Sequence, residues 1–117
     1  MDLEKIKKEV LKFQKERNWE KFHDPKSLAE LISVESGELL ELFLWKNREQ
    51  ILNEVNVNKG YKQEIADELA DVLLNCFQMA NALDFDIEKI FFNKLDKIKK
   101  KYPVEKALGV AVKYNKL

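Results

Sequence analysis

Apolar residues recur at intervals of three and four along most of this chain, which is the repeat of an α-helix that buries one face. Only three glycines and two prolines interrupt the 117 residues. No stretch alternates between apolar and polar residues as a half-buried strand does. The clearest apolar stripes run over residues 3–13, 28–43, 65–83 and 87–102. The sequence therefore predicts an all-α fold, a compact helical bundle of about four main helices, in one domain that spans residues 1–117.

The expected helix boundaries carry recognisable residues. Asp24 and Pro25 are typical of an N-cap followed by the first helical residue. Pro103 should end the last long helix, because proline lacks a backbone N–H and clashes with the preceding turn. A short additional helix is predicted over residues 47–55, followed by a loop over residues 56–60.

Charged side chains make up 36% of the chain, but 21 basic residues balance 21 acidic ones. This balance gives no electrostatic reason to expect a nucleic acid polymer or an anionic membrane as a partner. No apolar run approaches the ~20 residues needed to span a bilayer, and the first ten residues lack the apolar segment of a signal peptide. We therefore expect a cytoplasmic protein. Cys76, the single cysteine, lies in an apolar helical stretch and is interpreted as a small core residue.

Two pairs of carboxylates depart from the pattern of a solvated helix face. Glu35 follows Ile32 by three residues and Glu38 follows Glu35 by three, so both lie beside an apolar stripe. Glu68 and Asp71 repeat this arrangement on the next long helix. Four carboxylates that point toward a bundle interior repel one another, unless their pKa values rise or a hard cation compensates the charge. Mg²⁺ prefers oxygen ligands and suits carboxylates gathered from two helices.

Spacing alone leaves another interpretation open, because a single E-x-x-E pair is common on an exposed helix face. The occurrence of two such pairs, each at the edge of an apolar stripe, favours the metal site more than one pair does. Other kinds of site find less support. His23 is the only histidine and has no cysteine partners for a zinc site. The sequence also lacks a glycine-rich phosphate loop and a nucleophile elbow.

Five segments together carry a resemblance to a known family. They are R-N-W-E-K-F-H-D-P-K-S-L at 17–28, V-E-S-G-E-L-L-E-L-F-L-W-K at 34–46, D-E-L-A-D-V-L at 67–73, K-L-D-K-I-K-K-K-Y-P-V at 94–104 and K-Y at 113–114. In this order, over nearly the whole chain, they resemble the MazG-like all-α nucleoside triphosphate pyrophosphohydrolases, and within that class the dCTP pyrophosphatase branch. The two acidic pairs alone do not identify a family. Combined with the motifs W-E-x-F-H, F-x-W-K and K-Y-P, they are specific for this one.

The resemblance implies hydrolysis of a nucleoside triphosphate between its α- and β-phosphates, which gives a monophosphate and pyrophosphate. The expected substrate is dCTP or a related or modified pyrimidine deoxynucleotide, and the expected role is housecleaning of the nucleotide pool. Carried over by position, the Mg²⁺-binding and catalytic residues are Glu35, Glu38, Glu68 and Asp71. The resemblance also implies an assembly of identical subunits with helices packed between them, so we expect a homodimer or homotetramer.

The resemblance also implies two sets of substrate-binding residues. Aromatic side chains would line the base pocket, namely Trp19, Phe22, His23 and Trp45. Lysines and tyrosines would contact the triphosphate, namely Lys94, Lys101, Tyr102, Lys113 and Tyr114. Without the family, Trp19 and Trp45 would be interpreted as amphipathic residues at the edge of the core.

One position departs from the branch. Relatives often carry an asparagine in the last helix where this chain has Ile98. An asparagine could read a base edge and isoleucine cannot, so the departure bears on cytosine specificity more than on hydrolysis. The alternatives are a related pyrophosphohydrolase that acts on dUTP or phosphoribosyl-ATP, and a non-catalytic helical interaction module that keeps a metal site for structure.

Overall fold

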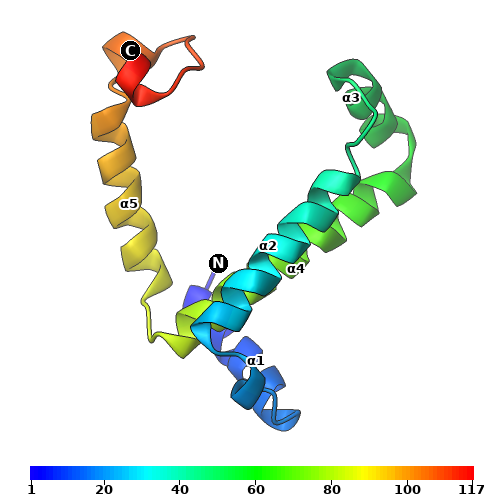
Figure 1. Cartoon of the computed structure of the whole chain (residues 1–117), viewed down its shortest axis with the longest axis vertical. Helices are drawn as coiled ribbons and strands as arrows, with labels where there is room; N and C mark the ends of the chain where they lie inside the picture. Colours follow the sequence, from blue (N-terminus) through cyan, green and yellow to red (C-terminus); the bar gives the residue numbers. More distant parts are fainter. The chain divides into compact units, whose positions relative to one another are not determined.

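All the regular secondary structure is helical in a computed structural model that describes residues 1–117. The long helices are α1 (Leu3–Glu16), α2 (Pro25–Glu41), α3 (Arg48–Val57), α4 (Lys59–Ala82) and α5 (Ile87–Lys101) (Figure 1). The short elements are η1 (Glu20–Phe22), α6 (Val104–Ala107) and η2 (Tyr114–Lys116). The prediction of an all-α fold is confirmed. None of these helices combines the length and apolar composition that crossing a membrane requires.

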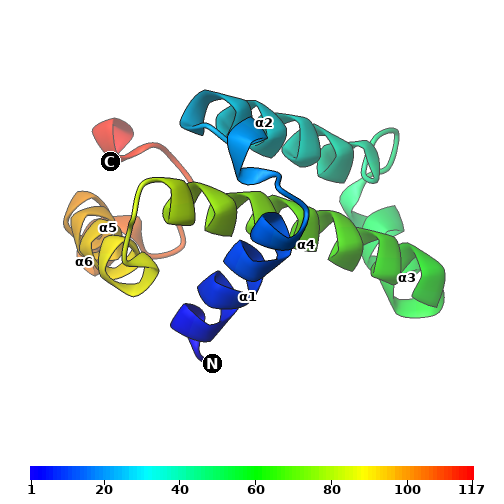
Figure 2. The same ribbon diagram turned by 90° about the horizontal axis from the view of Figure 1, so that it is seen from below.

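The chain divides into two compact units, Met1–Asp84 and Phe85–Leu117. In the first unit α4 is the central helix. α2 runs antiparallel alongside it, and α1 and α3 also pack against it (Figures 1 and 2). The second unit consists of α5, α6 and η2. Each unit is defined by itself, so the single domain over residues 1–117 stays a prediction.

Side-chain caps determine where the long helices begin. The Asp24 carboxylate accepts a hydrogen bond from the backbone N–H of Ser27 at 2.9 Å, and Pro25 is the first helical residue, as the sequence predicts. Asp86 caps α5 in the same way, through the backbone N–H of Lys89 at 3.1 Å. These bonds satisfy donors that have no partner inside the helix.

The junction between α3 and α4 is shorter than the sequence suggests. The short helix predicted over residues 47–55 is present as α3, but the loop predicted over residues 56–60 is wrong. Asn58 alone joins the two helices, as C-cap of α3 and N-cap of α4. Its side-chain oxygen accepts from the backbone N–H of Tyr61 at 3.1 Å. One asparagine that caps the next helix is enough to replace a loop.

The buried face of α4 differs from the predicted stripe. The buried residues of this helix are Tyr61, Asn75, Gln78 and Ala80, two of which have amide side chains. Leu69 and Leu73, which belong to the predicted stripe, are 49% and 50% exposed. Cys76 is also exposed, so its interpretation as a core residue is wrong. The error arises because α1 and α2 cover a face of α4 that apolar periodicity alone does not identify.

Candidate metal and nucleotide site

The four carboxylates that the sequence singles out come from the antiparallel helices α2 and α4. Glu35 and Glu38 lie one turn apart on α2, and Glu68 and Asp71 lie one turn apart on α4. Carboxylate oxygens of Glu35, Glu68 and Asp71 lie within 4.8 Å of one another, a spacing that suits shared coordination of one cation. Glu38 lies beside this cluster, within hydrogen-bonding reach of Glu35 and Glu68 when one of the carboxyl groups is protonated. The structure therefore brings all four side chains to one place.

Burial and the crowding of like charges raise the pKa values of two of these groups. The pKa of Glu35 is raised to about 7, first because burial disfavours its charged form. The hydrogen bond with Glu38 raises it further, and so does repulsion from Glu38, Asp71 and Glu68. Burial is also the largest cause that raises the pKa of Glu68, and the charges of Glu38 and Asp71 add to it. Without a cation, the protein favours protons on this cluster.

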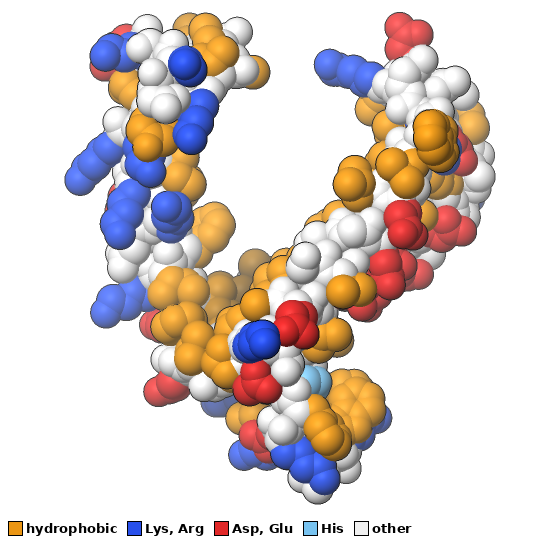
Figure 3. Space-filling model, viewed as in Figure 1, with side chains coloured by type: hydrophobic (Ala, Val, Ile, Leu, Met, Phe, Trp, Pro, Cys, Tyr) orange, Lys and Arg blue, Asp and Glu red, His pale blue; other side chains and the backbone are white.

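Two oxygens in the cluster have no hydrogen-bond partner. They are the Oε2 atoms of Glu35 and Glu68, and both are buried. A buried carboxylate oxygen without a donor is unfavourable, and a bound cation would supply the missing interaction. The donor set consists of carboxylates only, which is the chemistry that Mg²⁺ prefers. Figure 3 shows acidic side chains gathered along one side of the α2–α4 pair.

The aromatic residues predicted for the base pocket fall into two groups. Trp19, Phe22 and His23 lie at η1, before α2, and the rings of Trp19 and His23 meet edge to face at 6.3 Å. Trp45 lies beyond the opposite end of α2. A 17-residue helix is about 25 Å long. A single copy of the chain therefore does not bring Trp45 together with the other three side chains.

Sequence reasoning missed a buried polar group next to His23. The Gln14 amide nitrogen lies 2.8 Å from Nδ1 of His23, and Gln14 and Gln78 are 3% and 4% exposed. With Asn81 they line a cavity of about 60 Å³, in which the side-chain oxygens of both glutamines lack a partner. Such a polar cavity suits an ordered water that helps to orient the His23 ring. The sequence did contain a signal for this buried polar group: Gln14 follows Val10 by four residues and therefore lies on the buried face of α1.

Trp45 has an exposed side chain and an unusual backbone. Its φ is +66°, in the left-handed region that residues with a Cβ rarely occupy, and the residue is 98% exposed. Trp19, by contrast, is 42% exposed and packs edge to face against Phe13. The interpretation of Trp45 as a residue at the edge of the core therefore does not describe its surroundings.

The residues predicted for the triphosphate belong to the second unit. The rings of Tyr102 and Tyr114 meet edge to face at 6.2 Å, and the Tyr102 hydroxyl accepts from the backbone N–H of Tyr114 at 3.1 Å. The Lys101 ammonium lies 4.7 Å from the centre of the Tyr114 ring. The structure brings these three together at the end of α5, while Lys94 lies earlier on that helix and Lys113 directly precedes η2.

Comparison with known proteins adds to this geometry. The MazG-like family profile matches residues 31–117, which include all four carboxylates and Trp45. The dCTP pyrophosphatase 1 of Rattus norvegicus is 34% identical over 115 residues, which cover 98% of this chain and 67% of that protein. The dCTP pyrophosphatase 1 of Homo sapiens is 31% identical over 115 residues, with the same two coverages. The crystal structure of a pyrophosphatase from Archaeoglobus fulgidus matches with a TM-score of 0.77 at 32% identity, over 86% of this chain and 91% of that one.

Proposed function

This chain belongs to the MazG-like family, and from that premise we propose that it hydrolyses dCTP, or a related pyrimidine deoxynucleotide, to the monophosphate and pyrophosphate. Its general class, a nucleoside triphosphate pyrophosphohydrolase, follows from the similarity to pyrophosphatases along nearly the whole chain. The observation that carries the chemistry is the group of Glu35, Glu68 and Asp71, which presents buried carboxylate oxygens without partners.

The proposed cofactor is Mg²⁺, held by Glu35, Glu68 and Asp71 together with Glu38. When bound, the ion would supply a counter-charge for the phosphate oxygens and lower the pKa of a water. The chain contributes oxygens from two helices that pack side by side, so the ligand positions are set before binding. Without the ion, Glu38 lies close enough to share a proton with Glu35 and with Glu68.

The proposed nucleotide contacts are of two kinds: aromatic side chains for the base, and lysines and tyrosines for the triphosphate. Trp45 and the group formed by Trp19, Phe22 and His23 offer faces and edges for the base, since aromatic rings stack on nucleobases. The second set would bind the triphosphate through charge and hydroxyl groups; its members are Lys94, Lys101, Tyr102, Lys113 and Tyr114.

We also propose that the protein is a homodimer or homotetramer. Leu69, Leu73 and Cys76 follow one another at helical spacing on α4 and are exposed in the single chain. Leu31 and Val34 of α2 are exposed as well, at 36% and 56%. Apolar surface of this kind is covered when a second copy packs against it. A second copy could also bring Trp45 of one chain near the η1 aromatics of another.

Pyrophosphate release from a panel of nucleotides tests the proposed activity. The panel contains dCTP, CTP, dUTP, dATP and phosphoribosyl-ATP, each with Mg²⁺ and with a chelator. We expect release that depends on Mg²⁺ and is fastest with dCTP or another pyrimidine deoxynucleotide. Preference for phosphoribosyl-ATP would assign the chain to a different substrate class. Absence of release from every nucleotide would favour a non-catalytic helical module.

Sedimentation at micromolar concentration tests the assembly. We expect a mass that is a multiple of the 13.8 kDa chain, and a lower mass for Leu73→Glu, which places a charge on the exposed stripe. Lys12→Glu, which reverses an exposed charge on α1 away from that stripe, is the control and should leave the mass unchanged. An active 13.8 kDa monomer would contradict the proposed assembly.

A further inference from the structure

The backbone at Trp45 is held in a conformation that its own side chain disfavours. At the end of a helix the left-handed region is usually occupied by glycine or asparagine, because a Cβ is crowded there. Trp45 adopts it with φ +66°, and its side chain is exposed rather than buried. Folding thus gains no burial of the indole in return for the strain. Such strain persists only where the neighbouring structure holds it, and it is concentrated at functional sites.

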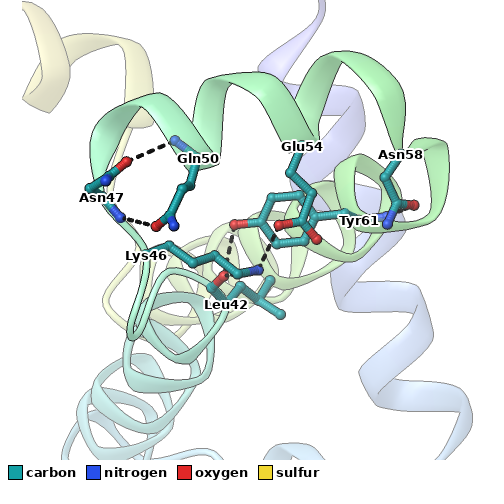
Figure 4. Close-up of polar contacts among 7 residues, drawn as sticks. All are labelled: Leu42, Lys46, Asn47, Gln50, Glu54, Asn58 and Tyr61. Atoms are coloured by element: carbon teal, nitrogen blue, oxygen red, sulfur yellow. Dashed lines mark hydrogen bonds and ion pairs between the residues drawn. The ribbon is translucent and has the colours of Figure 1, made fainter.

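The end of α2, just before Trp45, is tied to α4. The buried Tyr61 donates its hydroxyl hydrogen to the carbonyl oxygen of Leu42 at 2.7 Å, and the Lys46 ammonium lies 3.5 Å from the same oxygen (Figure 4). Leu42 is the C-cap of α2, so its carbonyl has no partner within that helix. These two side chains provide the partners and attach the helix end to its neighbour.

The residue after Trp45 is tied to α3 and α4. The Lys46 ammonium lies 3.0 Å from Oε2 of Glu54 and 4.0 Å from the centre of the Tyr61 ring (Figure 4). The side chains of this ion pair are 29% and 33% exposed, against 68% and 57% for the surface pair of Lys12 and Glu16. A less exposed pair is less screened by water and holds its geometry better.

A reciprocal capping box adds a third attachment. The Asn47 side chain accepts from the backbone N–H of Gln50 at 2.9 Å, and the Gln50 side chain accepts from the backbone N–H of Asn47 at 2.8 Å (Figure 4). This fixes Asn47, the N-cap of α3, two residues after Trp45. The segment that contains Trp45 is therefore held at both of its ends, and few backbone conformations remain open to it.

We propose that Lys46, Glu54 and Tyr61 are positioning residues that hold the backbone at Trp45, from which the indole projects to stack on the base of the bound nucleotide. This inference rests on the proposed function, in which Trp45 contacts the base. Holding the backbone at residue 45 fixes the point from which the indole projects, so less of this segment has to be ordered when the nucleotide arrives. The three residues act through Trp45, and none of them needs to touch the substrate.

Steady-state kinetics with dCTP and Mg²⁺ test the positioning role. Stacking on one base is worth a factor of ~5–150, so for Lys46→Met we expect KM to rise by about tenfold while kcat changes by less than about threefold. Glu54→Gln and Tyr61→Phe should act in the same direction, and Tyr61→Phe keeps the buried ring. Lys46→Arg preserves the charge and should restore most of the affinity. The control Lys12→Met removes the exposed ion pair and should change neither constant.

Coupling to Trp45 distinguishes positioning from direct contact with phosphate. In a Trp45→Ala background, Lys46→Met should raise KM no further, because the indole that Lys46 positions is gone. An undiminished effect there would mean that Lys46 acts on the substrate itself and would overturn the inference. KM values within twofold of the parent for all three single variants, with Trp45→Ala still impaired, would overturn the positioning role and leave the base contact intact.

Fluorescence provides a readout that is independent of turnover. With Trp19→Phe, Trp45 is the only tryptophan, and its anisotropy decay reports how freely the indole moves. We expect Lys46→Met to increase the amplitude of the nanosecond component of this anisotropy decay, and Lys12→Met to leave that amplitude unchanged. Equal decays in the two variants would overturn the inference. If Trp45→Ala has the parent's KM, the base contact fails and this inference fails with it. If the parent hydrolyses no nucleotide, the proposed function fails first.

Discussion

Two places along the α2–α4 pair use charged side chains in opposite ways. Midway along the helices, Glu35, Glu68 and Asp71 gather like charges, and two of their buried oxygens lack partners. Where α2 ends, Lys46 and Glu54 form a partly buried ion pair, and Tyr61 adds a hydrogen bond. Unsatisfied charge marks a place that suits a bound cation. Satisfied charge marks a place where the chain holds itself in shape.

The largest effect should come from the unsatisfied cluster. Asp71→Asn or Glu38→Gln should lower kcat/KM by about 10–100-fold at limiting Mg²⁺, since changes around a metal site commonly cost this much. Helix content should stay the same, because both side chains are exposed. Pyrophosphate release and circular dichroism measure the two quantities. Near-normal turnover of both variants at limiting Mg²⁺ would mean that these residues hold no metal.

A smaller effect is expected at the end of α2. Trp45→Ala should raise KM by about tenfold, through the loss of one stacking contact. Lys99→Ala, which removes an exposed lysine on α5, should leave KM unchanged. Melting temperatures establish first that both variants are folded. A folded Trp45→Ala protein with the parent's kinetics on every nucleotide would mean that the base pocket lies elsewhere.

The smallest effect concerns pH and stability without metal. Because the pKa of Glu35 rises from 4.5 to about 7 on folding, the folded protein holds a proton that the unfolded chain has already released. Its contribution to stability is present at acid pH and is lost as the pH rises through about 7. We therefore expect the melting temperature in a chelator to fall between pH 5 and pH 8 by several degrees, as linkage predicts for a raised carboxyl pKa.

Two comparisons sharpen that measurement. Glu35→Gln should flatten the decline in melting temperature, whereas Glu30→Gln, an exposed carboxylate on the same helix, should not. Added Mg²⁺ should raise the melting temperature more at pH 8 than at pH 5, because the ion competes with protons for the same oxygens. An equal rise in melting temperature with Mg²⁺ at pH 5 and at pH 8 would indicate that Mg²⁺ binds at other groups.

Most of the local structure could be predicted from residues that are neighbours in sequence. Asp24 and Pro25 indicated the start of α2, Pro103 indicated the end of α5, and the spacing of Glu35 and Glu38 placed them one turn apart. Each of these features depends on hydrogen bonds and side-chain periods within a few residues. Such information is present in any short stretch of the chain.

Other features depend on which residues the packing brings together. The sequence by itself determined that the chain is helical and which carboxylates share a helix face. Only the tertiary structure decided that Glu35 meets Glu68 and Asp71, and that Tyr61 reaches Leu42 across 19 positions. It also decided that α4 buries Asn75 while Leu69 stays exposed. The reason is that a helix with apolar residues on several sides can bury any of them, and the neighbours that compete to cover it settle the choice.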